Sequence, residues 1–127
     1  MVSLSVHHNC WFHRSKPTYL PAENIIWDDL TVAEHLKVFA ALNGNWSARH
    51  SWHVWASRFG LLDESYKRGV ELDIEARRRL GLACAFIGGA EVVCLQSPTK
   101  DLNSTAATSI WETLSVRQNS RLGLLVF

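Results

Sequence analysis

The sequence has no excess of charge of either sign, because 13 Lys and Arg side chains stand against 12 Asp and Glu side chains. A formal net charge of +1 gives no electrostatic reason to expect a nucleic acid partner. No apolar run reaches the roughly 20 residues that a membrane helix needs, since glycines and Glu91 interrupt the longest one, at 80–95. The start of the chain lacks the charged and long apolar segments of a secretory signal. These absences favour a cytoplasmic domain without direct membrane insertion.

The cysteines and glycines do not form the sequence patterns that would indicate disulfide bonds or a phosphate-binding loop. The three cysteines are odd in number, which favours reduced packing thiols over disulfides. None of the seven glycines belongs to a G-x-x-x-x-G-K-[ST] motif, the loop whose backbone and lysine hold nucleotide phosphates. Four possible metal ligands cluster near the start at spacings that match no zinc signature, and we expect no metal there: His7, His8, Cys10 and His13.

The apolar residues that are present indicate an α/β fold. A hydrophobic content of 47% is enough to build a core. Helical spacing predicts one apolar stripe facing that core, and Gly88-Gly89 suits the end of this helix: Ala76, Leu80, Ala83, Cys84 and Ile87. The run Val92–Leu95 follows at once, and its lack of alternation predicts a strand buried on both faces.

Two further helices are expected earlier in the chain. Thr31 and Glu34 have the spacing of a capping box, which predicts a helix from there to Leu42. A second helix is expected at 46–59, with Gly60 as its stop. Its tryptophans recur at helical spacing, which favours core positions over the alternative of a ligand-stacking surface.

A further helix and strand are expected after Val92–Leu95. The helix, 104–118, turns four side chains inward: Ala107, Ile110, Trp111 and Leu114. The terminal run, 122–127, predicts a second strand. Strand, helix and strand then form a right-handed βαβ unit.

Several phrases of this sequence resemble the ATP-binding cassette of ABC transporters of subfamily A. Residues 20–36 are similar to the family's Q-loop phrase, C-P-Q-x-N-x-L-[FW]-D-x-L-T-V-x-E-H-L. The pattern from the signature L-S-G-G-x-x-R to the Walker B ending L-D-E-P-T is kept by Arg79-Leu80, Ala85-Phe86-Ile87-Gly88-Gly89, Val92-Val93, Leu95 and Pro98-Thr99. The resemblance implies a partial P-loop NTPase-like domain, in which a helical subdomain precedes a βαβ unit of the parallel sheet.

The resemblance also implies a division of the chain. Residues 1–19 are expected to be an unrelated or disordered leader. The cassette-like part spans 20–127, with the Q-loop and helical subdomain in 20–72 and the signature helix, Walker B strand, D-loop, helix and terminal strand in 73–127. Because the phosphate loop is missing and the chain stops before the family's switch histidine, we expect a truncated domain.

The positions that carry the family's chemistry hold other residues. Ala22 stands at the Q-loop glutamine, Asp73, Ile74 and Glu75 at the signature serine and glycines, Gln96 and Ser97 at the Walker B carboxylates, and Asn103 at the D-loop aspartate. Carboxylates at the signature helix start would repel a triphosphate. An amide and a hydroxyl cannot accept a proton near neutral pH. We therefore expect no intact catalytic residue, no metal site, and no ATP or magnesium cofactor such as the intact family uses.

These features imply an ATP-binding domain fragment that ancestrally coupled ATP binding and hydrolysis to lipid transport and is now catalytically inactive. Two alternatives remain, a nucleotide-independent interaction module that docks on a transporter through 31–59, and a non-functional gene remnant. A working ATPase completed by another chain is disfavoured, because Gln96 and Ser97 stay unsuitable whichever partner arrives. Expected partners are an ABC transporter transmembrane domain or an intact nucleotide-binding domain, at the cytosolic face of a membrane. The isolated chain is expected to self-associate.

Overall fold

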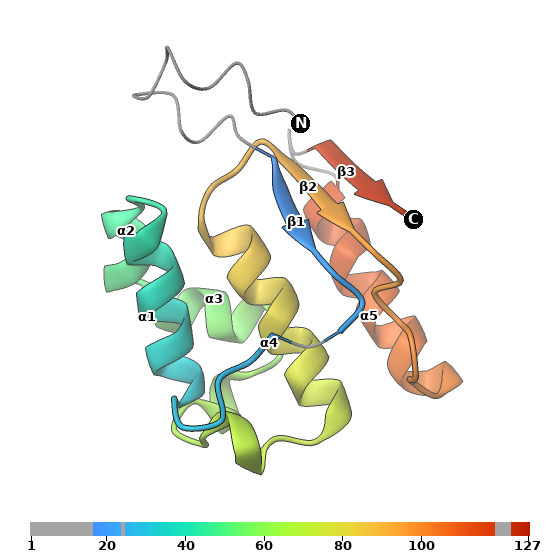
Figure 1. Ribbon diagram of the computed structural model, residues 1–127, viewed down its shortest axis with the longest axis horizontal. Helices are drawn as coiled ribbons and strands as arrows, with labels where there is room; N and C mark the ends of the chain where they lie inside the picture. The colour runs from blue at the N-terminus through green and yellow to red at the C-terminus, as the bar shows by residue number, and fades with distance from the viewer. Residues whose placement is uncertain (1–16, 24, 119–122) are drawn as a thin grey trace.

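The computed structural model describes residues 17–23, 25–118 and 123–127 (Figure 1). Its elements follow the order β1 (Thr18–Leu20), α1 (Val32–Leu42), α2 (Trp46–His50), α3 (Trp52–Arg58), the 3-10 turns η3 (Leu62–Glu64) and η4 (Gly69–Glu71), α4 (Ile74–Ile87), β2 (Val92–Leu95), α5 (Ser104–Gln118) and β3 (Gly123–Val126). The expected α/β class is confirmed. The possible metal ligands at 7–13 lie outside the described residues.

Three parallel strands form the sheet, in the order β1-β2-β3. β2, α5 and β3 make the expected parallel βαβ unit. β1 was not expected from the sequence, and it places Thr18 and Tyr19 before the expected boundary at residue 20. A three-residue strand between Pro17 and Pro21 shows too little pattern to be recognised without its partner.

One face of the sheet is covered by helices and the other is open. Figure 1 shows α4 beside β1, which it contacts, and α5 behind β2 and β3, and the strand residues of the covered face include the buried Leu20, Val93 and Leu95. Tyr19, Cys94 and Leu125 are partners in the strand register and therefore share a face. On that face Tyr19 is 53% exposed and Leu125 is 57% exposed, and the Tyr19 ring stacks on Phe127 with centroids 6.1 Å apart.

The helix starts match the sequence-based expectations because their caps are local. Thr31 accepts a hydrogen bond from the Glu34 N–H, and the Glu34 carboxylate accepts one from the Thr31 N–H, which completes the capping box of α1. Asp73 accepts from the Ala76 N–H at 2.8 Å and begins α4. α4 then ends at Gly88-Gly89, where Gly89 adopts a left-handed φ of 81°.

The single helix expected at 46–59 is two short helices, which corrects the sequence interpretation. Ser51, with φ −106° and ψ 32°, ends α2 and begins α3. Its hydroxyl donates to the Ser47 carbonyl oxygen at 2.9 Å, the kind of local bond by which serine competes with a helix. The expectation for the tryptophans was also partly wrong, because Trp46 is 58% exposed while Trp52 and Trp55 only half enter the core.

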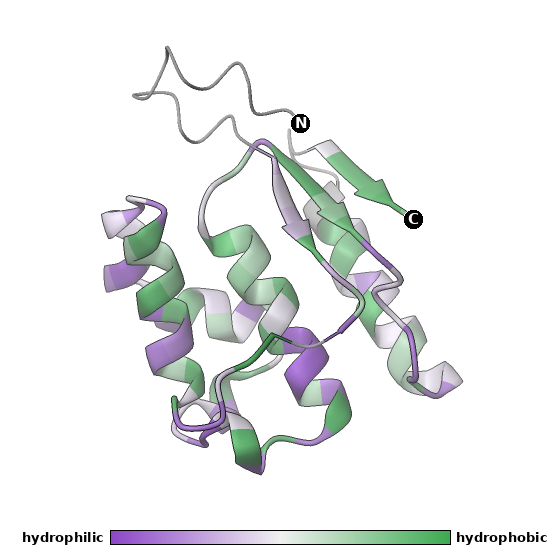
Figure 2. Ribbon diagram, in the orientation of Figure 1, coloured by the Kyte–Doolittle hydropathy of each residue, from purple (hydrophilic) through white to green (hydrophobic). Residues whose placement is uncertain are grey.

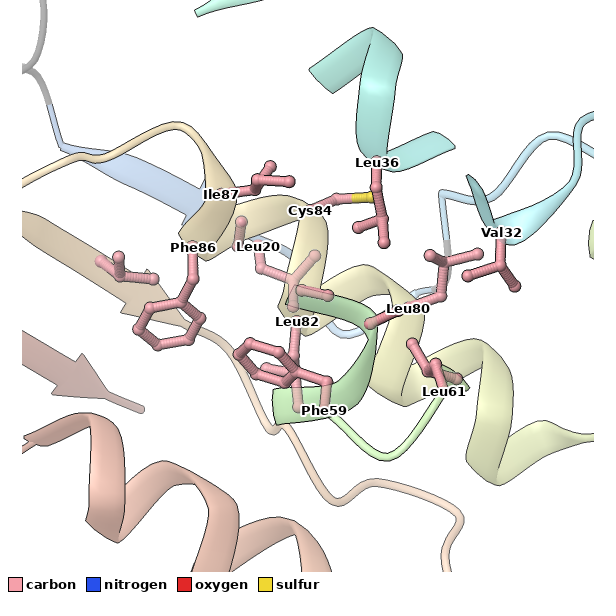
Figure 3. Close-up of a cluster of buried hydrophobic side chains, with 14 of the residues drawn as sticks. Leu20, Val32, Leu36, Phe59, Leu61, Leu80, Leu82, Cys84, Phe86 and Ile87 are labelled. Atoms are coloured by element: carbon pink, nitrogen blue, oxygen red, sulfur yellow. The ribbon is translucent and has the colours of Figure 1, made fainter. Parts of the chain in front are cut away.

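α4 is the centre of the core (Figure 3). Residues 80–87 of this helix are all buried, so apolar contacts surround its second half instead of forming the expected single stripe. Phe86 packs against Phe59, with ring centroids 5.7 Å apart. Figure 2 shows the same division along α4, hydrophilic in its first turns and hydrophobic beyond them.

Two side-chain expectations around the sheet are also corrected. β2 alternates in burial, with Val93 and Leu95 inaccessible and Val92 and Cys94 half-buried, because only one face of the sheet carries helices. On α5 the buried residues include Ala106, Ile110 and Leu114, whereas Trp111 is 41% exposed. The stripe facing the core is therefore narrower than the sequence suggested.

His35 is a buried polar residue of α1 with both ring nitrogens engaged. Its Nε2 accepts a hydrogen bond from the Trp27 N–H at 3.0 Å, and its Nδ1 lies 2.8 Å from the Thr31 carbonyl oxygen. This pairing requires a neutral ring that donates from Nδ1. Burial lowers the pKa of His35, which also favours the neutral form.

No helix among the residues described is both long and apolar enough to cross a membrane.

Candidate functional site

Gln96 follows the carboxyl end of β2, and its side chain contacts Tyr19 of β1 and Ala22 in the loop after it. Its side-chain carbonyl oxygen accepts a hydrogen bond from the Tyr19 hydroxyl at 2.6 Å and another from the Ala22 N–H at 3.3 Å. The backbone N–H of Gln96 donates to the Leu20 carbonyl oxygen at 3.0 Å. The residue expected at the Walker B aspartate position thus lies against the residue expected at the Q-loop glutamine position. The amide tethers β1 and the following loop to β2.

Ser97 makes a turn directly after Gln96. It has a left-handed φ of 44°, an uncommon conformation for a residue with a Cβ atom. Its N–H donates to the Phe127 carbonyl oxygen at 2.6 Å, and its carbonyl oxygen accepts from the Lys100 N–H at 3.0 Å. The backbone of Ser97 therefore ties the end of β3 to this turn.

Arg78 is a buried cation that the sequence interpretation did not single out. It is only 4% exposed, and its Nη2 donates to the Ala22 carbonyl oxygen at 2.5 Å. Its Nε is buried and has no hydrogen-bond partner among the described residues. Burial lowers the pKa of Arg78, while the charges of Asp101 and Glu23 oppose that shift. An arginine keeps its proton even so.

A sequence signal for Arg78 did exist. Leu82 and Ala85 lie four and seven residues further along α4, so helical spacing places Arg78 on a face that is buried. The spacing of L-S-G-G-x-x-R, counted from Leu72, also puts the motif's arginine at Arg78. The run of three arginines hid which one enters the core.

The three signature positions stand at the start of α4, and their carboxylates are occupied within the helix. The Asp73 carboxylate caps the Ala76 N–H, and Glu75 pairs with Arg79 at 2.8 Å. Ile74 is 50% exposed. Anionic side chains therefore already fill the end of the helix where an anion would bind.

Arg79 fixes this first turn to its surroundings. Its guanidinium donates to the Ser109 hydroxyl on α5 and, at 3.4 Å, to the Phe59 carbonyl oxygen after α3. The D-loop position is separate from this network. Asn103 accepts from the Ala106 N–H at 2.8 Å and acts as the cap of α5.

The structure therefore joins only part of the expected site. Ala22 and Gln96 are bonded to each other, and Ser97 follows in the chain. The carboxylates of Asp73 and Glu75 make their contacts within α4, with the Ala76 N–H and with Arg79. The link from α4 to the Ala22 loop is Arg78. Within the described ranges, no group of three or more His, Cys, Asp or Glu side chains is placed to hold a metal ion.

Known proteins are similar to this sequence over most of its length, although no family model matches it. The bovine (Bos taurus) retinal-specific phospholipid-transporting ATPase ABCA4 is 33% identical over 103 residues, which are 80% of this chain and 4% of that protein. The phospholipid-transporting ATPase ABCA3 of Rattus norvegicus is 31% identical over 107 residues, or 83% of this chain and 6% of that protein. The rat ATP-binding cassette sub-family A member 17 is 27% identical over 114 residues, 88% of this chain and 6% of that protein.

The fold has a counterpart among solved structures. A chain described as "Structure of ATP binding subunit of ABC transporter" superposes with a TM-score of 0.75 at 18% identity, covering 95% of this chain and 51% of the other. The chain is therefore related to the subfamily A ABC transporters, of which it matches one short segment, and it has the fold of part of that ATP-binding subunit.

Proposed function

We propose that this chain is a catalytically inactive part of a subfamily A ATP-binding domain. Its relatives ABCA4 and ABCA3 are named as phospholipid-transporting ATPases. By that relationship, the ancestral role of this segment is to couple ATP binding and hydrolysis to lipid transport. The segment keeps the scaffold of that role and lacks its chemistry.

The observation that carries the proposal is the position of the Gln96 amide. Its carbonyl oxygen is already used by the Tyr19 hydroxyl and the Ala22 N–H. Hydrolysis of ATP needs an anionic oxygen to hold magnesium and a group that orients or deprotonates the attacking water. A neutral amide committed to two internal donors supplies neither.

The neighbouring positions support the same conclusion. Ser97 is uncharged and cannot act as a base near neutral pH. At the start of α4 the carboxylates of Asp73 and Glu75 stand where a phosphate would need unoccupied N–H groups. Ala22 presents a methyl group where the family has a glutamine. Ala22, Asp73, Ile74, Glu75, Gln96, Ser97 and Asn103 are then structural residues in this chain.

A partner is part of the proposal. An intact nucleotide-binding domain or a transporter's transmembrane domain, met at the cytosolic face of a membrane, would complete the segment. The open face of the sheet supports this, because parallel sheets are normally covered on both sides, whereas Tyr19 and Leu125 remain exposed here. The domain division at residues 19/20 and 72/73 belongs to the same proposal, with β1 crossing the first boundary.

ATP turnover by the purified chain tests the proposal. We expect no magnesium-dependent phosphate release above that of a heat-denatured sample, and no retention of labelled ATP in equilibrium dialysis. Removing one electrostatic catalytic group typically costs about 100- to 1,000-fold in rate, and several are replaced here. Turnover that disappears in Gln96→Leu or Ser97→Ala, prepared in parallel, would show that the chain itself hydrolyses ATP and would overturn the proposal.

A further inference from the structure

The helical part of the chain carries cations and tryptophans but no carboxylate over a long stretch. Between Glu34 and Asp63 the sequence contains no Asp or Glu. Within that stretch lie the residues that we name the tryptophan–cation surface: Lys37, Trp46, Arg49, Trp52, Trp55 and Arg58. They come from α1, α2 and α3, which pack together at one end of the molecule (Figure 1). The near-neutral charge of the whole chain conceals this local excess of positive charge.

Each cation of this surface lies over an indole ring. The Arg58 guanidinium is 5.0 Å from the centroid of Trp55, and the Arg49 guanidinium is 5.9 Å from that of Trp46. The Lys37 ammonium is 5.5 Å from the centroid of Trp52. The attraction between a cation and the face of an aromatic ring holds such pairs together. Positive charge and aromatic surface are therefore presented side by side.

Apolar side chains on the same helices are also exposed to solvent. Leu42 at the end of α1 is 71% exposed, Trp46 is 58% exposed, and Val54 on α3 is 38% exposed. Single exposed apolar residues are common, but these three lie within thirteen consecutive positions that also hold Arg49. The result is a surface that is both apolar and cationic.

Two of the three carboxylates that flank this stretch in the sequence have partners outside the surface. Glu34 is occupied by the capping box of α1, where it accepts from the Thr31 N–H at 2.8 Å. Glu64, in η3 beyond α3, pairs with Lys67 at 3.1 Å. Asp63 is exposed at the same turn and is the only other acidic side chain of η3.

We propose that the tryptophan–cation surface binds the surface of a bilayer that contains anionic lipid. Tryptophan prefers the boundary between headgroups and hydrocarbon, because its ring is apolar and its N–H needs a polar partner. Arg49, Arg58 and Lys37 would face the lipid phosphates, and Leu42 and Trp46 would enter the boundary region. An acidic polypeptide would match the charge, but it would offer these apolar side chains no apolar medium. The binding is peripheral, consistent with the absence of a membrane-crossing helix among the described residues.

Co-sedimentation of the 127-residue chain with lipid vesicles tests this proposal. The vesicles are phosphatidylcholine alone, or phosphatidylcholine mixed with phosphatidylserine. We expect binding to the mixed vesicles only, and weaker binding as salt is raised, because salt screens exposed charges. Arg49→Gln should weaken binding about fivefold, the effect of one cation near an anionic surface. Trp46→Ser should weaken it as well.

Matched controls come from outside the surface. Lys100→Gln removes an exposed cation, and Trp111→Ser removes an exposed tryptophan from α5, so both should leave vesicle binding unchanged. All four substitutions are at the surface, and thermal melting of each variant checks that it is folded. No nucleotide is present, so the outcome is independent of the proposed loss of ATPase activity.

Three outcomes would overturn the proposal. The first is no binding, or equal binding to neutral and mixed vesicles. The second is equal loss of binding in the surface variants and in Lys100→Gln or Trp111→Ser, which would place the contact elsewhere. The third is binding to polyglutamate in preference to the mixed vesicles, which would identify an acidic polypeptide as the occupant.

Discussion

Replacing Gln96 by Asp should lower the stability of the chain without creating activity. The shorter side chain loses about 1.5 Å of reach, the length of one C–C bond, so its oxygens withdraw from both the Tyr19 hydroxyl and the Ala22 N–H. Each hydrogen bond contributes roughly 0.5–1.5 kcal/mol, and the one to Tyr19 belongs at the low end because it is exposed. The expected loss is therefore about 1–2 kcal/mol of unfolding free energy. At about 4 °C per kcal/mol for a chain of this size, the melting temperature should fall by about 4–8 °C.

Gln96→Glu is the matched control for this substitution. It has the length of glutamine, and its carboxylate can accept both hydrogen bonds, so its stability should stay near that of the unmodified chain. Thermal melting and urea unfolding give the stability of the unmodified chain and of the Gln96→Asp and Gln96→Glu variants. Equal destabilisation by Asp and Glu would refute the reasoning from reach, because charge rather than length would then decide the result. The combined Gln96→Asp and Ser97→Glu variant should likewise show no ATP turnover, and a gain of turnover would mean that another chain supplies the phosphate cradle.

Three further predictions concern the scaffold. Asp73→Ala should cost about 1 kcal/mol in urea unfolding, because the Ala76 N–H loses its cap, whereas Asp73→Ser should retain most of that stability. The unfolding free energy should fall as pH drops below about 6.5, because burial lowers the pKa of His35 in the folded chain. The stability that the neutral ring provides is fully present above the unfolded pKa and is lost as pH falls through the folded pKa. The melting temperature of His35→Gln should depend less on pH. The isolated chain should form concentration-dependent oligomers in sedimentation velocity runs, because the sheet has open edges and an exposed face with Tyr19 and Leu125, and a compact monomer with cooperative melting would contradict this.

Helix positions could be read from the sequence because the signals that start and stop helices lie within a few residues of each other. The Thr31 capping box and the Asp73 cap of α4 are both local, and α5 spans the residues expected of it. The break at Ser51 was missed because the apolar pattern continues through it. A serine hydroxyl that bonds back to the chain carries no periodic signal.

The missed features of the site depend on contacts between distant segments. β1 has only three residues and exists through its pairing with β2. Helical spacing could have placed Arg78 on a buried face, but its partner, the Ala22 carbonyl oxygen, is known only from the fold. The substitutions at Gln96 and Ser97 were visible in the sequence, but the bond between Gln96 and Ala22 needed the fold. Sequence periodicity reports on residues within a few turns of one element, so it cannot specify contacts between distant segments.

The pairing of β1 with β2 has a consequence for how the chain folds as it is made. The Ala22 N–H and the Gln96 side chain that holds it are 74 residues apart in sequence. At a synthesis rate of roughly 5–20 residues per second, β1 therefore waits on the order of 4–15 s before its partner strand exists. α1, α2 and α3 contact one another and can form during that interval, whereas the parallel pairing must close a long loop. During those seconds the backbone N–H and C=O groups of Thr18, Tyr19 and Leu20 lack the partner strand that they have in the folded chain.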